Sequence, residues 1–109
     1  MSSDFYCEQV LNGKTKVDIV EETNNVIAFH HTNPSWPIHI IVIPKKHFAS
    51  LLDMTDADHE ILLEMMSVIQ KITQQVLREN GKCRLTTNFG DYQNSKHLHW
   101  HIYVGSMQS

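Results

Sequence analysis

The hydrophobic pattern of this chain changes its period once along the sequence, and this change limits the folds that the chain can form. Between Thr55 and Asn80, apolar residues recur at helical spacing, which predicts one long amphipathic helix. Thr55 is a good N-cap for this helix, and Gly81 is a suitable stop. The stripe that would face the core is formed by Ile61, Leu62, Met65, Ile69, Ile72 and Val76.

Strand-like patterns lie on both sides of the predicted helix. We expect strands over residues 15–22, 25–30, 38–44, 83–90 and 97–105, and a brief helix over residues 5–11. The last two strands are joined by a short loop, so we expect them to be antiparallel. The pattern predicts an α+β fold with a mainly antiparallel sheet of about five strands, one long helix and a short N-terminal helix.

Length, charge and cysteine content restrict the class of protein. The 109 residues predict a single domain over 1–109, with residues 1–3 outside a core at about 4–105. A net charge of −3 provides no basic field for nucleic acid or a membrane surface. No apolar run approaches the roughly 20 residues that span a bilayer, and the first residues do not resemble a signal peptide. Cys7 and Cys83 form no CxxC pair, so we expect free thiols and a cytoplasmic protein.

Histidine is the compositional outlier of the chain. Three of the eight histidines, His97, His99 and His101, occupy alternate positions in "HLHWHIYVG", residues 97–105. Side chains two apart on a strand share a face, so these imidazoles would project together, with Tyr103 next to them. The residues between them are apolar and would face the core.

This histidine face has four interpretations. Simple exposure to solvent is disfavoured by the regular alternation opposite an apolar face. A metal site, with His39 as a further ligand, is disfavoured because the three same-face positions span roughly 13 Å. A neutral imidazole can instead attack phosphorus as a nucleophile, while its neighbours stabilise charge and move protons. The same face could also bind an anion without chemistry.

Three segments together match one known pattern. "HLHWHIY" fills every position of a motif in which histidines alternate with hydrophobic residues. "VIAFHHTNPSWPIHIIVIPKKHF" matches a strand, a proline loop and a second strand, and "LTTNFGDYQNSKHLHWH" matches an asparagine strand and the loop before the histidines. In these motifs, over about residues 4–105, the chain resembles the histidine triad (HIT) superfamily of nucleotide hydrolases and transferases. In length and order it is most similar to the Hint-type nucleotide-binding branch, which implies the HIT fold.

The resemblance implies a role for each of four histidines. His99 would be the nucleophile that takes the nucleotidyl group on Nε2, and His101 would lie beside the scissile bond and assist the leaving group. His97 would orient His99, because its backbone carbonyl fixes the His99 tautomer. His39, inside the apolar run "IHIIVIP", would be a fourth histidine that hydrogen-bonds to the triad. This chemistry requires no metal and no cofactor.

The resemblance also implies contacts to a purine nucleotide or nucleoside phosphoramidate. Asn88 would hydrogen-bond near the phosphate, and Phe29 and Ile27 would line the base pocket. The family commonly has an acidic residue that holds the ribose hydroxyls at the position of His31. An imidazole cannot accept hydrogen bonds from both hydroxyls as a carboxylate does, so nucleotide preference is expected to differ.

Further departures from the family pattern affect the leaving group and a structural metal site. A serine usually stands at the position of Asn94, so Asn94 or the next residue, Ser95, would contact the leaving group, and Lys96 adds positive charge. Asp4 replaces the first cysteine of a zinc-binding CxxC pair, so we expect no zinc site. The sequence ends four residues after Gly105, so we expect weaker or different substrate selection from across a dimer.

These observations lead to one expected function with two alternatives. We expect a homodimer that cleaves nucleoside 5′-phosphoramidates or acyl-nucleotides at the α-phosphorus, through a covalent His99 intermediate, and releases nucleoside monophosphate. The first alternative is a dinucleoside polyphosphate hydrolase that uses the same nucleophile. The second is a nucleotide-binding or partner-binding module with little turnover. We expect no nucleic acid or membrane partner.

Overall fold

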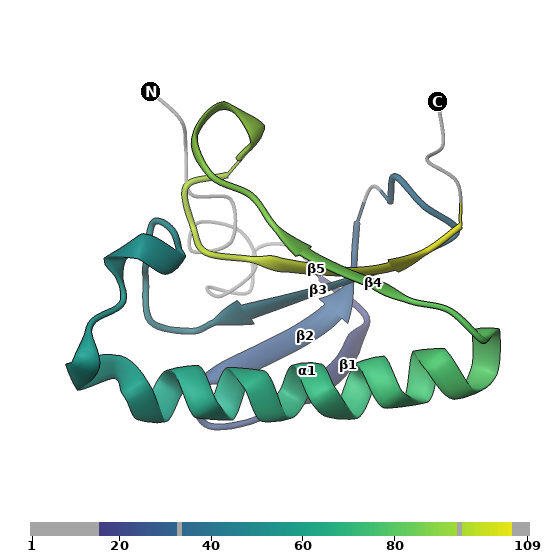
Figure 1. The fold of residues 1–109 in the computed structure, drawn as a ribbon, viewed down its shortest axis with the longest axis horizontal. Helices are drawn as coiled ribbons and strands as arrows, with labels where there is room; N and C mark the ends of the chain where they lie inside the picture. The colour runs from purple at the N-terminus through teal and green to yellow at the C-terminus, as the bar shows by residue number, and fades with distance from the viewer. Residues whose placement is uncertain (1–15, 33, 94, 106–109) are drawn as a thin grey trace.

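A single antiparallel sheet organises the computed structural model, which describes residues 16–32, 34–93 and 95–105. The strands pair in the order β1-β2-β3-β5-β4, and every pairing is antiparallel (Figure 1). Their bounds are β1 Ile19–Glu22, β2 Val26–His30, β3 Ile38–Pro44, β4 Arg84–Thr87 and β5 Trp100–Val104. The predicted α+β class and five-stranded sheet are confirmed, whereas the helix predicted over residues 5–11 lies outside the described residues.

The long helix α1, His59–Asn80, crosses one face of the sheet (Figure 1). Its start differs from the prediction, because Thr55 caps a short 3₁₀ turn, Asp56–Asp58, that precedes the helix. Gly81 ends the helix as predicted: it adopts φ 75°, and its N–H donates to the Leu77 carbonyl. No helix in the described part of the chain is long and apolar enough to cross a membrane.

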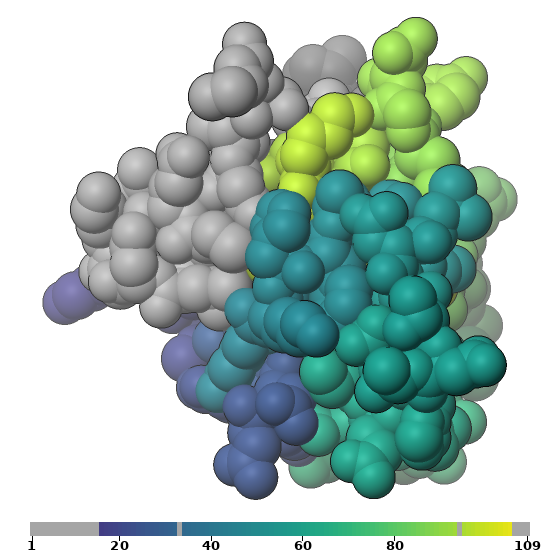
Figure 2. All heavy atoms as spheres, turned by 90° about the vertical axis from the view of Figure 1, so that its left-hand side faces the viewer, coloured from purple at the N-terminus to yellow at the C-terminus, as the bar shows by residue number. Residues whose placement is uncertain are grey.

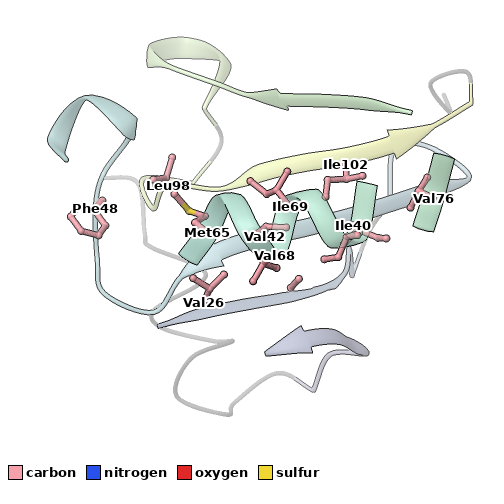
Figure 3. Close-up of a cluster of buried hydrophobic side chains, with 12 residues drawn as sticks. Val26, Ile40, Val42, Phe48, Met65, Val68, Ile69, Val76, Leu98 and Ile102 are labelled. Atoms are coloured by element: carbon pink, nitrogen blue, oxygen red, sulfur yellow. The ribbon is translucent and has the colours of Figure 1, made fainter. Parts of the chain in front are cut away.

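The main core lies between α1 and the sheet. Because strand side chains alternate between faces, Ile40 and Val42 of β3 point toward the helix together with Ile102 of β5 (Figure 3). The predicted helical stripe supplies the opposing side chains Met65, Ile69, Ile72 and Val76, joined by Val68. Each fully buried aliphatic side chain of this kind stabilises the fold by about 1.5–3 kcal/mol relative to an exposed one.

The opposite face of the sheet carries a second apolar cluster and the histidines. Ile27 and Phe29 of β2 pack there with Ile41 and Ile43 of β3. His39 belongs to the same face, because it stands two positions before Ile41 on β3. The alternation of β3 therefore separates the packed core from the face that carries the candidate site.

The last strand is shorter than the sequence predicts. We expected a strand from His97, but β5 begins at Trp100. The main chain before it bonds elsewhere: Leu98 N–H donates to the Phe48 carbonyl, and the carbonyl of His99 accepts from Thr87 Oγ1. The segment between β3 and α1, teal in Figure 2, therefore lies against the yellow-green loop that precedes β5.

Candidate active site

His99 lies in the loop just before β5 and is almost completely buried. Its Nδ1 lies 2.7 Å from the carbonyl oxygen of His97. A carbonyl can only accept a hydrogen bond, so Nδ1 carries the proton and donates it. In the neutral imidazole the lone pair is then on Nε2, the nitrogen that can act as a nucleophile.

His97 fixes the backbone that holds His99. Its side chain is fully buried, and its Nε2 donates to the carbonyl of Pro44 at 2.8 Å. The His47 ring packs against it edge-on, with the ring centres 5.2 Å apart. His97 thus ties the loop before β5 to the end of β3, and its own carbonyl remains directed at His99.

His39 and His101 form a directional pair on neighbouring strands. The Ser35 N–H donates to His39 Nδ1 at 3.2 Å, so in the neutral ring the proton of His39 is on Nε2. That Nε2 lies 2.7 Å from His101 Nδ1, which therefore accepts. The proton of neutral His101 is then on Nε2, an atom that is buried and has no hydrogen-bond partner among the described residues. An unmet buried donor is costly, so an acceptor beside this atom would stabilise the site.

Burial keeps this pair uncharged near neutral pH. It lowers the pKa of His39 to about 3, with a further contribution from repulsion by His31. It lowers the pKa of His101 to about 4, with repulsion by His99 as the next cause. The low pKa values follow from geometry, because protonation would place one charged imidazole against another in a poorly solvated site.

A ladder of rings extends the site beyond the triad. His31 stacks on His39, with centres 4.4 Å apart and an interplanar angle of 12°. Trp36 meets His39 edge-on at 4.7 Å and stacks on Tyr103 at 3.9 Å. The sequence motifs did not single out Trp36 as a site residue; Tyr103 was indicated only by its place in the alternation.

The other predicted residues lie at different depths around the histidines. Asn88 follows β4 by one residue and is half-buried, with no hydrogen bond to another described residue. Thr86 pairs with His101, so the same face two positions on brings Asn88 toward His99. Phe29 and Ile27 are 1% and 7% exposed in the second cluster, and Ser95 is buried at 8%. Asn94 lies outside the described residues.

Polar groups around the histidines hydrogen-bond to the histidine rings and main chain. In the described ranges, no group of three or more His, Cys, Asp or Glu side chains is placed to hold a metal. Thr87 and Ser35 contribute hydrogen bonds that no sequence pattern indicated, since the first joins β4 to the loop before β5 and the second depends on how the loop before β3 folds.

Comparison with known proteins places this geometry in one family. Residues 4–109 match a family model described as scavenger mRNA decapping enzyme C-term binding. An uncharacterized HIT-like protein of Chlamydia muridarum is 34% identical over 102 residues, which span 92% of this chain and 80% of that protein.

Solved structures agree with this match. A histidine triad protein from Clostridium difficile is 36% identical, with a TM-score of 0.79 over 96% of this chain and 92% of its own. A HIT family hydrolase from Legionella pneumophila is 29% identical, with a TM-score of 0.80 over 95% of this chain and 94% of its own. The chain therefore belongs to the histidine triad superfamily and has the HIT fold.

Proposed function

We propose that this protein is a metal-independent nucleotide hydrolase that cleaves nucleoside 5′-phosphoramidates or acyl-nucleotides at the α-phosphorus. The observation that carries the proposal is the 2.7 Å hydrogen bond from His99 Nδ1 to the His97 carbonyl, because it leaves the Nε2 lone pair for attack. The similarity to HIT family hydrolases supports the same reaction class.

The first step forms a covalent intermediate. His99 Nε2 attacks the α-phosphorus, and the bond from phosphorus to the leaving nitrogen or oxygen breaks with its electron pair. A leaving amine takes the proton it needs from solvent. The new nucleotidyl-imidazole is cationic, and the hydrogen bond from Nδ1–H to the His97 carbonyl stabilises it. His101 Nε2–H donates to an oxygen at the reacting phosphorus or to the leaving atom.

The second step releases the nucleotide. Water attacks phosphorus, the bond to Nε2 breaks, and its electron pair returns to the imidazole. The proton lost by water replaces the one that the leaving amine took up, so the enzyme is restored. The reaction splits one difficult substitution into two easier ones without a cofactor.

The remaining predicted residues complete the proposed site for a purine nucleotide. Asn88, with an amide that has no partner among the described residues, is suited to donate to a phosphoryl oxygen. Phe29 and Ile27 supply the apolar contact for the base, and Ser95 or Asn94 would contact the leaving group. His31 would donate one hydrogen bond to the ribose in place of an acidic residue.

We also propose that the enzyme is a cytoplasmic homodimer. β4 is an edge strand, and Leu85 on it is 41% exposed, which suits pairing with a second copy. Cys83 is a free thiol, as is usual in a reducing compartment.

The decisive experiment measures AMP release from adenosine 5′-phosphoramidate in the presence of EDTA. Wild type should turn over, and His99→Ala should lose activity while AMP binding, followed by calorimetry, is retained. Rapid acid-free quenching should trap a nucleotidyl adduct on wild type alone. Activity that disappears with EDTA and returns with Zn²⁺ would contradict metal independence. Binding of AMP without turnover would leave only a nucleotide-binding module, and preferential cleavage of diadenosine tetraphosphate would favour a polyphosphate hydrolase.

A further inference from the structure

A surface hollow of about 640 Å³ continues the histidine face toward one end of the sheet. Its walls include Trp36 and Tyr103, which stack on each other with ring centres 3.9 Å apart. Trp36 also meets the ring of His101 edge-on at 6.4 Å. The aromatic wall of the hollow is therefore in direct contact with the histidine pair of the candidate active site.

The strand register places a cation on the same face. Tyr103 follows His101 by two positions on β5, so the two side chains share a face and start roughly 7 Å apart. Arg84 pairs directly with Tyr103, at the end of the sheet where β4 begins and β5 ends (Figure 1). Directly paired residues project to the same side, so Arg84 starts beside Tyr103 on the histidine face.

The charge of the hollow differs from that of the whole chain. Lys82 and Arg84 line it, and none of the described residues that line it is Asp or Glu. Neither cation forms an ion pair or a side-chain hydrogen bond with another described residue. The chain as a whole carries a net charge of −3, so these two adjacent cations are not part of a generally basic surface.

The position of the hollow relative to the reacting groups indicates what it would bind. His99, His101 and Tyr103 follow one another at alternate positions, so the hollow lies beyond His101 as seen from the nucleophile. A leaving group long enough to extend past His101 along this strand meets Trp36 first and would bring its far end to Lys82 and Arg84.

We propose that this hollow is a leaving-group subsite that selects leaving groups with an anionic group several bonds from the phosphorus bond that breaks. The inference rests on the proposed function and specifies its substrate class. The methylene chain of such a group would pack on Trp36, and its carboxylate would pair with Arg84 and Lys82. His39 and His101 are neutral near pH 7, so these two cations supply the fixed positive charge at this end of the site.

The chemical step is unchanged by this selection. The phosphorus–nitrogen bond breaks, the amine leaves with a proton from solvent, and the anionic group remains intact as a recognition element. Exposed ion pairs contribute modestly, so two of them predict a preference of about tenfold in kcat/KM.

The test compares two substrates that differ only in charge. They are adenosine 5′-phosphoramidates in which the leaving amine is 4-aminobutanoate or its uncharged amide, 4-aminobutanamide. Wild type should cleave the carboxylate substrate with about tenfold higher kcat/KM, and added salt should reduce this ratio because exposed charges are screened. In the double variant Lys82→Gln/Arg84→Gln the ratio should fall close to one.

A matched control removes the same charge elsewhere. Lys71→Gln/Arg78→Gln takes two cations from α1, on the other face of the sheet, and should keep the wild-type ratio. Equal cleavage of both substrates by wild type, or an unchanged ratio in the Lys82/Arg84 variant, would overturn the subsite. Adenosine 5′-phosphoramidate, whose leaving group is only ammonia, distinguishes failure of the subsite from failure of the proposed function. If wild type cleaves this substrate but shows no preference between the two longer substrates, only the subsite is refuted. If wild type does not cleave it, the proposed function fails as well.

Discussion

Acid should destabilise this fold through the buried pair His39 and His101. In the unfolded chain both imidazoles have the ordinary pKa of 6.5, whereas folding lowers the pKa to about 3 and about 4. As the pH falls below 6.5, the unfolded state therefore binds more protons than the folded state. The stabilising difference is fully present above pH 6.5 and is lost progressively as the pH falls toward about 4 for His101 and about 3 for His39.

The size of the effect follows from these pKa values. Consider a histidine that stays neutral in the folded state and titrates normally in the unfolded state. Between pH 7 and pH 5 it lowers the free energy of unfolding by at most about 2 kcal/mol. His39 is almost fully buried and should approach this value. His101 is half-buried, so solvent reduces its share, and we expect about 3 kcal/mol for the pair.

Urea denaturation at pH 7 and pH 5 measures this loss. Each protein is compared with itself, so a variant that is less stable at both pH values remains informative. The double variant His39→Gln/His101→Gln cannot titrate at these positions, and its loss of stability between the two pH values should be smaller than that of wild type by about 3 kcal/mol. If wild type and the double variant lose the same free energy, the two imidazoles are not held neutral and the account is wrong.

Two further substitutions test the scaffold around the site. Glu64→Ala removes the carboxylate that accepts hydrogen bonds from Thr23 Oγ1 and from the main-chain N–H and side-chain amide of Asn25. Thermal or urea unfolding should show that the free energy of unfolding falls by about 2 kcal/mol. An unchanged stability would show that these hydrogen bonds do not stabilise the fold. Gly105→Ala should destabilise the fold by about 1–3 kcal/mol and lower kcat/KM, because Gly105 has φ 102° and an added Cβ would lie 2.8 Å from Pro37 Cδ. A fully stable, fully active Gly105→Ala protein would show that the loop next to Trp36 shifts at no cost.

Much of the fold could be predicted because its signals are local. The helical period over residues 61–76 identified the face of α1 that is buried, and Gly81 identified its end. The β-branched run of β3 was correctly predicted over Ile38–Pro44. Helix start and strand lengths were less accurate, since they depend on which partners compete for main-chain groups. Thr55 capped a 3₁₀ turn instead of α1, and Phe48 took the N–H of Leu98 that a longer β5 would have used.

The candidate site shows the same division. The sequence indicated which histidines belong together, because alternation and a match to a family motif are both properties of the chain order. It could not indicate that Trp36 stacks on Tyr103, or that Ser35 N–H sets the protonation of His39. The Trp36–Tyr103 contact joins a loop to a strand that is distant in sequence, and the Ser35–His39 contact depends on how the loop before β3 folds, so no spacing rule predicts either.

The sequence by itself determined the elements of this protein, the face of each that is apolar and the set of imidazoles available for chemistry, since periodicity follows directly from the residue order. Only the tertiary structure decided which nitrogen of His39, His97 and His101 carries the proton. That choice depends on the Ser35 N–H and on the Pro44 carbonyl, whose positions relative to the rings are fixed by folding. The tertiary structure also placed Lys82 and Arg84 at the end of the histidine face, because antiparallel pairing of β4 with β5 sets which residues become neighbours.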